Sequence, residues 1–196
     1  MLPYRGPLCR RCGIPLSSDV SKICAECIKE YPAFINARSF GSYNGALRTA
    51  INLFKYHGVK RLSKPLSDII SQLKIPRVDT VVPVPLYNKR LRQREFNQSA
   101  LLAKNMAGYL GVPLMLSCLV KVRDTLPQVG LNSKQRHKNI RKAFKIRDRS
   151  LIKGKRILLV DDVITTGATI RECSGELKKA GAEGIFAIAL AHGTRD

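Results

Sequence analysis

Short apolar runs alternate with amphipathic segments over most of this chain. Strands are predicted over 38–43, 80–84, 157–160 and 185–190, and the last three are apolar at nearly every position. Strands that are apolar on both faces are typical of a parallel sheet covered by helices on both sides. The pattern therefore predicts an α/β protein with a doubly wound, mostly parallel sheet.

Helices are predicted between these strands, where apolar residues recur every three or four positions. Leu47, Ile51 and Phe54 follow this spacing, and Gly58 is expected to end their helix. A second helix is predicted over 65–73. Two more helices, over 98–109 and over 170–180, are each followed by a glycine that can end them.

Two polar segments are predicted to be loops. Residues 88–96 form a short basic loop after the strand over 80–84, and Asn97 is expected to cap the helix that follows. Residues 121–142 are longer, basic and only weakly periodic. A connection of that length inside a compact domain is usually functional or mobile.

The charge is concentrated in the middle of the chain. The formal net charge of the 196 residues is +21, and residues 36–156 carry all of it. Such a field favours polyanionic partners, namely nucleic acid, a phosphorylated metabolite or anionic lipid. Taken singly, Lys55, Lys60 and Lys74 are expected to be solvated surface residues.

Several protein classes are excluded by the sequence. No apolar run is long enough for a membrane span, and residues 1–22 lack the apolar core and cleavage site of a signal peptide. Collagen-like, low-complexity and disulfide-scaffold compositions are also absent. We therefore expect a soluble protein of the cytoplasm.

Four of the six cysteines lie within nineteen residues, as two CxxC pairs: Cys9, Cys12, Cys24 and Cys27. Two such pairs suit tetrahedral Zn²⁺, because each turn presents two thiolates to one point. The surrounding residues 1–35 are too poor in apolar side chains to bury a core, so a structural metal would supply the missing folding energy. An iron–sulfur cluster uses the same ligands and stays an alternative.

The sequence thus predicts two units, a four-cysteine zinc-knuckle module over 1–35 and an α/β domain over 36–196. The two remaining cysteines, Cys118 and Cys173, are expected to be small core residues.

Two aspartates, Asp161 and Asp162, directly follow the buried strand over 157–160. In an open α/β sheet, ligands bind beyond the carboxyl ends of the strands. The next loop supplies hydroxyls, a glycine and the first N–H groups of a helix, which together can cradle a monophosphate. The carboxylates can accept hydrogen bonds from ribose hydroxyls or help to hold Mg²⁺. The predicted cradle consists of Thr165, Thr166, Gly167, Ala168 and Thr169.

The sequence ILLVDDVITTGAT at 157–169 resembles the motif with which type I phosphoribosyltransferases bind phosphoribosyl pyrophosphate (PRPP). Together with DTVVPVPL at 79–86, RQREFNQSALLA at 92–103, the segment 122–144 and the CxxC pairs, it resembles the ComF/ComFC family. These competence-associated proteins combine an amino-terminal zinc module with a phosphoribosyltransferase domain. The resemblance covers nearly the whole chain, although the family usually has glycine where this chain has Glu95.

The resemblance implies a type I phosphoribosyltransferase fold that binds PRPP together with Mg²⁺. Asp161 and Asp162 would be the catalytic residues and would hold the ribose hydroxyls, while the cradle would bind the 5′-phosphate. The diphosphate would lie against Pro85, Leu86, Tyr87, Arg90, Arg92 and Arg94. The segment 121–142 would correspond to the flexible loop that closes over such sites, and its most family-like members are Arg123, Gln128, Arg136 and Asn139.

The acceptor of the phosphoribosyl group is not identified by the sequence. Phe40, Tyr43 and Tyr56 are candidates for stacking on a base. His57 and His137 are weaker candidates for acid–base groups, because a lone histidine in a basic segment is more often a surface residue.

Residues 134–156 contain eleven basic side chains and one acidic one. Single-stranded DNA could follow such a surface through phosphate contacts, with aromatic side chains available for stacking. The predicted nucleic-acid-binding residues are Arg92, Arg136, Lys138, Arg141, Lys142, Lys145, Arg147 and Arg149.

The family resemblance implies a role in DNA uptake during natural transformation. Two hypotheses stay open: an active transferase, and a catalytically silent nucleic-acid-binding or sensor protein that keeps the phosphate site. The expected partners are PRPP, single-stranded DNA and proteins of the competence machinery. These partners could also hold the protein peripherally at the inner membrane.

Overall fold

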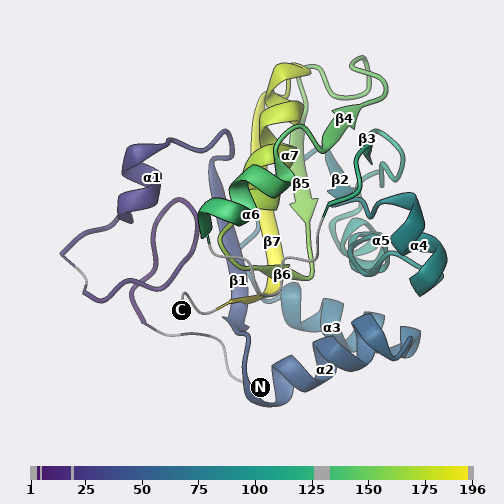
Figure 1. Cartoon of the computed structure of the whole chain (residues 1–196), viewed down its shortest axis with the longest axis horizontal. Helices are drawn as coiled ribbons and strands as arrows, with labels where there is room; N and C mark the ends of the chain where they lie inside the picture. The colour runs from purple at the N-terminus through teal and green to yellow at the C-terminus, as the bar shows by residue number, and fades with distance from the viewer. Residues whose placement is uncertain (1–3, 5, 19, 126–132, 194–196) are drawn as a thin grey trace.

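The computed structural model describes the chain apart from residues 1–3, 5, 19, 126–132 and 194–196, and apart from the side chains of residues 133, 134, 136 and 137. Its centre is a parallel sheet, as predicted (Figure 1). A two-residue strand, β6 (Val163–Ile164), also pairs with the central strand β7. The order across the sheet is β1 (Asn36–Ser42), β7 (Gly184–His192), β5 (Arg156–Val160) and β2 (Thr80–Pro83).

Alternate side chains of the central strands face two separate hydrophobic layers. Leu158 of β5 is aligned with Phe186 of β7, and both pack in one layer. Their neighbours Leu159 and Ala187 pack in the other. Burial on both faces is why these strands are continuously apolar in sequence.

The first layer is covered by helices α2 (Gly45–Tyr56), α3 (Ser63–Ile70) and α5 (Gln98–Leu110). All three were predicted, with boundaries that differ by a few residues. The side chain of Asn97 caps α5 by accepting a hydrogen bond from the N–H of Ser99. In Figure 1, α2 and α3 lie beyond the arrowheads of the strands, where ligands bind in such sheets.

The second layer is covered by helix α7 (Ala168–Lys179), helix α6 (Ser133–Ile140) and the antiparallel strands β3 (Leu119–Lys121) and β4 (Phe144–Ile146). Cys118 and Cys173 are both buried here, as expected for core residues. The predicted loop over 121–142 therefore contains a helix, while Gln128 lies outside the described residues.

The basic segment 88–96 is not a loop, so that prediction is wrong. Asn88–Arg94 form helix α4, although none of its side chains is buried. Lysine, arginine, leucine and glutamine are all good helix formers, and their intrinsic preference favours a helix even without an apolar face. The helix ends at Glu95, which has a left-handed backbone (φ 63°) at the position where the family usually has glycine.

The cysteine-containing segment lies along the outer side of β1. The N–H of Ala37 donates to the carbonyl oxygen of Arg11 at 2.7 Å. Gly13 packs against the carbonyl of Ala37 so closely that an added Cβ would lie 2.3 Å from its oxygen. Among the described residues of this segment, Ala25–Lys29 form the short helix α1. Within the described part of the chain, no helix is both long and apolar enough to cross a bilayer.

Candidate functional site

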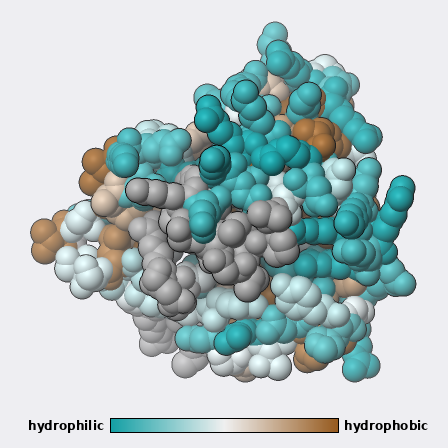
Figure 2. All heavy atoms as spheres, viewed as in Figure 1, coloured by the Kyte–Doolittle hydropathy of each residue, from teal (hydrophilic) through white to brown (hydrophobic). Residues whose placement is uncertain are grey.

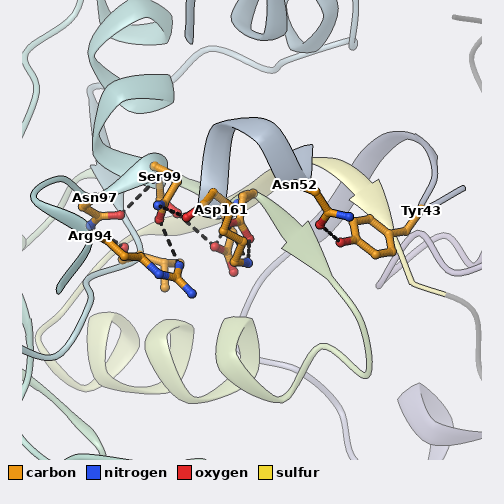
Figure 3. A network of polar contacts seen from close by, with 10 residues as sticks. Tyr43, Asn52, Arg94, Asn97, Ser99 and Asp161 are labelled. Atoms are coloured by element: carbon orange, nitrogen blue, oxygen red, sulfur yellow. Dashed lines mark hydrogen bonds and ion pairs between the residues drawn. The ribbon is translucent and has the colours of Figure 1, made fainter. Parts of the chain in front are cut away.

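Asp161 and Asp162 lie where β5 ends, and the neighbouring strand β7 fixes their backbone. The N–H of Asp161 donates to Ile188, and the N–H of Leu190 donates to the carbonyl of Asp162. Asp161 Oδ1 accepts hydrogen bonds from Ser99 Oγ at 3.0 Å and from the N–H of Asp162 at 2.9 Å (Figure 3). The Asp161 carboxylate is thus held from α5 as well as from its own strand.

Lys55 of α2 forms an ion pair with Asp162. Its Nζ lies 2.8 Å from Oδ2 and 2.9 Å from Oδ1, so one ammonium group contacts both carboxylate oxygens. Asp162 is only 6% exposed. The expectation that Lys55 is a solvated surface residue is therefore wrong.

Burial and the neighbouring charges change the pKa of Asp161 and that of Lys55. The pKa of Asp161 is raised to about 7, because burial and the charge of Asp162 outweigh the opposing effects of Lys55 and Ser99. For Lys55, burial lowers the pKa, but the carboxylates of Asp162 and Asp161 together outweigh burial and the net pKa is raised. Near neutral pH, Asp161 can therefore either donate or accept a proton.

The predicted phosphate cradle connects β6 to α7. Gly167 has φ 76°, and the space beside it is open, with no atom within 4 Å of a Cβ built there. Thr166 Oγ1 accepts a long hydrogen bond, 3.4 Å, from the N–H of Ala168. Thr165 and Thr169 are half-buried. A twelve-residue helix begins at this loop, and its first N–H groups suit an anion.

The loop after β2 lies beside the aspartates. The N–H of Val84 donates to Val160, the last residue of β5, and Asn97 Nδ2 donates to the carbonyl of Val84 at 3.0 Å. The predicted diphosphate-binding residues Pro85, Leu86 and Tyr87 follow directly and are half-buried.

Two cations converge from α4 and β3. Arg90 Nη2 donates to the carbonyl oxygen of Thr125 at 2.6 Å, and Lys121 Nζ donates to Thr125 Oγ1 at 2.8 Å. Burial and the charge of Arg90 lower the pKa of Lys121 to about 8, against the opposing charge of Asp161. Arg90 was predicted as a diphosphate-binding residue, whereas Lys121 was not singled out.

The other two arginines of α4 differ in their surroundings. Arg94 Nη1 donates to Gln98 Oε1 at 3.3 Å, and its guanidinium lies 5.0 Å from the centre of the Tyr56 ring. Gln98 is fully buried, and its Nε2 donates to the backbone carbonyl of Lys55 at 3.3 Å. Arg92 is exposed.

The prediction that Phe40 could stack on a base is wrong, because this side chain is buried in the core. Tyr43 is half-buried, and its hydroxyl donates to Asn52 Oδ1 at 2.7 Å (Figure 3). Tyr56 is exposed beside Arg94. His57 is an exposed residue just after α2, and the side chain of His137 lies outside the described part of the structure.

The residues missed by sequence reasoning are Lys55, Gln98, Ser99 and Lys121. Lys55 gave a usable signal, because it lies eight positions after Leu47 and thus on the apolar stripe of its helix. Gln98 and Ser99 belong to the REFNQS segment that carries the family resemblance, but their contacts connect elements far apart in the chain. Lys121 had no such signal.

The four amino-terminal cysteines converge. Their sulfur atoms all lie within 4.8 Å of one another, and the Sγ atoms of Cys12 and Cys24 are 3.6 Å apart. Tetrahedral zinc with Zn–S bonds of about 2.3 Å needs sulfur separations of about 3.8 Å, so the cluster fits the ion. Burial raises the pKa of the Cys12 thiol and raises that of Cys27 to about 11, whereas backbone hydrogen bonds outweigh burial at Cys9 and lower its pKa to about 7. A bound cation favours thiolates, so metal binding is expected to release protons from the cluster.

The predicted nucleic-acid-binding residues fall mainly on α6, β4 and the turns around them. Figure 2 shows hydrophilic side chains over much of this face. Arg123 is not free for a ligand, because its Nη2 donates to the carbonyls of Asn139 and Arg141 at the end of α6. The side chain of Arg136 lies outside the described part. Besides Arg92 on α4, the exposed members are Lys138, Arg141, Lys142, Lys145, Arg147 and Arg149.

Comparisons with known proteins agree with this geometry. Residues 97–195 match the family model described as "Phosphoribosyl transferase domain". The chain is 32% identical to Competence protein F of Haemophilus influenzae, over 94% of this chain and 84% of that protein. It is 30% identical to DNA utilization protein YhgH of Salmonella typhi (91% and 81% covered) and 28% identical to Competence protein ComFC of Streptococcus pneumoniae (89% and 77% covered). The chain therefore belongs to the ComF/ComFC family and carries a phosphoribosyltransferase domain of the type I fold.

Proposed function

We propose that this protein binds PRPP with Mg²⁺ at the carboxyl ends of β5 and β7 and serves DNA uptake during natural transformation. The observation that carries the proposal is that one short stretch of chain after β5 contains two carboxylates, Asp161 and Asp162, then Gly167 with open space beside it, and then the N-terminus of α7. The role in DNA uptake is supported by the relatives, which are named for competence or for DNA utilization.

In this proposal, each part of PRPP has its own group of residues. Asp161 and Asp162 accept hydrogen bonds from the ribose hydroxyls, and residues 165–169 bind the 5′-phosphate. The loop 85–87, with Arg90 and Arg94, faces the diphosphate. The carboxylate oxygens of the aspartates are ligands that suit Mg²⁺, whose charge would offset that of the diphosphate.

The ion pair of Lys55 and Asp162 gives the site a further property. Both oxygens of Asp162 already contact one ammonium group. A ribose hydroxyl must therefore share this carboxylate with Lys55 or displace it, whereas Asp161 has one oxygen, Oδ2, without a hydrogen-bond partner among the described residues. We infer that Asp161 forms the stronger contact with the sugar.

Calorimetry with PRPP and Mg²⁺ tests the proposal. The wild type is expected to bind, and the double variant Asp161→Asn, Asp162→Asn is expected to lose binding while its circular dichroism stays unchanged. Asp148→Asn, which removes an exposed carboxylate on the turn after β4, is the matched control. Equal affinity in the double variant and the control would place the ligand elsewhere. Release of pyrophosphate with a panel of nitrogenous bases then distinguishes an active transferase from a silent binding protein.

The amino-terminal unit has a separate proposed role. Residues 1–35 would form a structural zinc module and residues 36–196 the phosphoribosyltransferase-like domain. The convergence of four sulfurs and the shortage of other buried apolar side chains in this segment support zinc as the source of its folding energy.

A second function, the binding of single-stranded DNA, is favoured by the exposed cations of α6, β4 and their turns. Lys142 is close to the second turn of α7, because its N–H donates to the Glu172 carboxylate, whereas Arg149 lies beside the carboxyl-terminal end of that helix, near Lys179 and Ala180. PRPP should therefore compete with DNA at Arg90 and Arg94 but not at Arg149. We propose a cytoplasmic protein that reaches the inner membrane only through DNA or protein partners.

A further inference from the structure

Arg171 lies in the first turn of α7, directly after the proposed phosphate cradle. Its backbone N–H donates to the carbonyl oxygen of Gly167 at 2.8 Å. This hydrogen bond closes the first turn of the helix. Any change in the position of Arg171 is therefore transmitted to the backbone that faces the phosphate.

The side chain of Arg171 extends to the cysteine cluster. Its Nη2 donates to the sulfur of Cys27 at 3.2 Å, and its Nη1 donates to the carbonyl oxygen of Glu30 at 2.7 Å. Cys27 lies in α1, and Glu30 immediately follows this helix. A planar guanidinium with two acceptors fixes direction as well as distance.

The charge of Arg171 suits this place. Four thiolates around Zn²⁺ carry a net charge of two negative units. A cationic donor to one of the sulfurs offsets part of that charge. Loss of an outer hydrogen-bond partner of a metal ligand commonly lowers metal affinity by about 10- to 100-fold.

The cysteine segment is also attached to β1. Arg38 Nη2 donates to the carbonyl of Arg10 at 3.0 Å, and the N–H of Ala37 donates to Arg11 at 2.7 Å. The close packing of Gly13 on Ala37 leaves little freedom at this contact. The cysteine segment thus contacts both β1 and α7, so a change in its fold would affect both elements.

We propose that Arg171 is a positioning residue that couples metal binding by the four cysteines to the orientation of the first turn of α7, and thereby to phosphate binding. The link between the cysteines and α7 stands independently, whereas its effect on phosphate binding rests on the proposed function. Because coupling between two binding sites is reciprocal, zinc should strengthen PRPP binding by the same factor by which PRPP strengthens zinc binding.

The test uses the full chain and three variants. Arg171→Met removes the guanidinium, Arg171→Lys keeps the charge without the two directed donors, and Lys179→Met removes an exposed cation from the far end of the same helix as a control. Zinc release to a chromogenic chelator is expected to be about 10-fold faster in Arg171→Met, unchanged in Lys179→Met and intermediate in Arg171→Lys.

Amide hydrogen exchange of residues 168–172 measures the coupling itself. In the wild type and in Lys179→Met, removal of zinc should increase exchange in this turn. In Arg171→Met, exchange should be fast already and should not respond to zinc. Equal zinc release and an equal exchange response in Arg171→Met and the control would overturn the proposal. If Arg171→Met does not fold, the same comparison is made with Arg171→Lys.

Calorimetry with PRPP and Mg²⁺ is the final measurement. Zinc-loaded wild type should bind several-fold more tightly than zinc-stripped wild type, and this difference should vanish in Arg171→Met. A wild type that does not bind PRPP at all refutes the proposed function and the effect on phosphate binding, while zinc release and exchange still decide the link between the cysteines and α7.

Discussion

Lys55 Nζ contacts both carboxylate oxygens of Asp162, at 2.9 and 2.8 Å, although the two residues are 107 positions apart in the chain. The pair joins α2 to the end of β5. It therefore fixes the helix that follows β1 to the part of the sheet where ligand binding is proposed.

Replacement of Lys55 by methionine is expected to lower the free energy of unfolding by about 2–4 kcal/mol, because it leaves the buried Asp162 carboxylate without its partner. The added replacement Asp162→Asn should recover part of that loss, since no unpaired charge then remains. Chemical denaturation of the two single variants and the double variant measures the coupling. Strictly additive effects would show that the pair contributes nothing.

Asp161 should make stability depend on pH. Its pKa is raised from 3.8 to about 7, so the folded state binds a proton more tightly than the unfolded state. The stability from this group is fully present below pH 3.8 and is lost as the pH rises through 7. Asp161→Asn should therefore be the more stable protein at pH 8, by on the order of 1 kcal/mol or more, and close to the wild type at pH 4.

Denaturation curves at both pH values check this expectation. Asp148→Asn is the control of opposite sign, because hydrogen bonds from Ser150 lower the pKa of Asp148. The same stability difference between Asp161→Asn and the wild type at pH 4 and pH 8 would contradict the assignment.

Glu95 has the left-handed backbone that glycine adopts without strain. Glu95→Gly is expected to stabilise the protein by about 1 kcal/mol, since a left-handed conformation costs a residue with a Cβ about that much. Glu95→Ala keeps the strain and loses only an exposed ion pair with Lys60, at 3.6 Å, so it should be neutral or slightly destabilising. Thermal melts of both variants test the prediction, and a less stable glycine variant would refute it.

Cys9→Ser should abolish stoichiometric zinc binding, because it removes one of the four converging sulfurs. The sheet is expected to stay folded, since its two hydrophobic layers do not include the cysteine cluster apart from contacts with Cys12. Elemental analysis and circular dichroism provide the measurement, with Cys118→Ser as a control outside the cluster. Wild type that contains no zinc, or that shows an iron absorption band, would contradict the metal assignment.

Single-stranded DNA binding should weaken when Lys145, Arg147 and Arg149 are changed together to glutamine. If each contacts one phosphate, the slope of log affinity against log salt should become less negative by about 2, at roughly 0.7 per contact. The control removes three exposed cations from the opposite face of the sheet, by changing Lys74, Arg77 and Lys104 to glutamine. Equal slopes in the two triple variants would show that Lys145, Arg147 and Arg149 do not contact the DNA.

The sheet was predictable because its strands are buried on both faces, and such burial leaves an uninterrupted apolar run in the sequence. The helix ends were predictable where a cap or a glycine marks them, as at Asn97 and Gly111. Both signals are local, so they can be read without knowledge of the partner elements.

Helix α4 and the environment of the aspartates could not be predicted in the same way. Residues 88–94 were predicted to be a loop because they are basic, although most of them have a good intrinsic helix preference. Glu95 adopts a left-handed backbone, which its residue type does not predict. The ion pair of Lys55 and the hydrogen bond of Ser99 depend on the tertiary arrangement of α2 and α5 around β5. The sequence showed a charged residue on an apolar stripe but not its partner.

The position of the cysteine segment on β1 has a consequence for self-association. Strand β1 is the last strand on its side of the sheet, and its outer side is met by the backbone of the cysteine segment through hydrogen bonds such as that from Ala37 to Arg11. An uncovered outermost strand is a template onto which another chain can add. The cysteine segment thus covers this edge of the sheet. If zinc folds the segment as proposed, loss of the metal would uncover β1 and favour aggregation, so the zinc supply of the cell would help to determine how long the folded protein stays in solution.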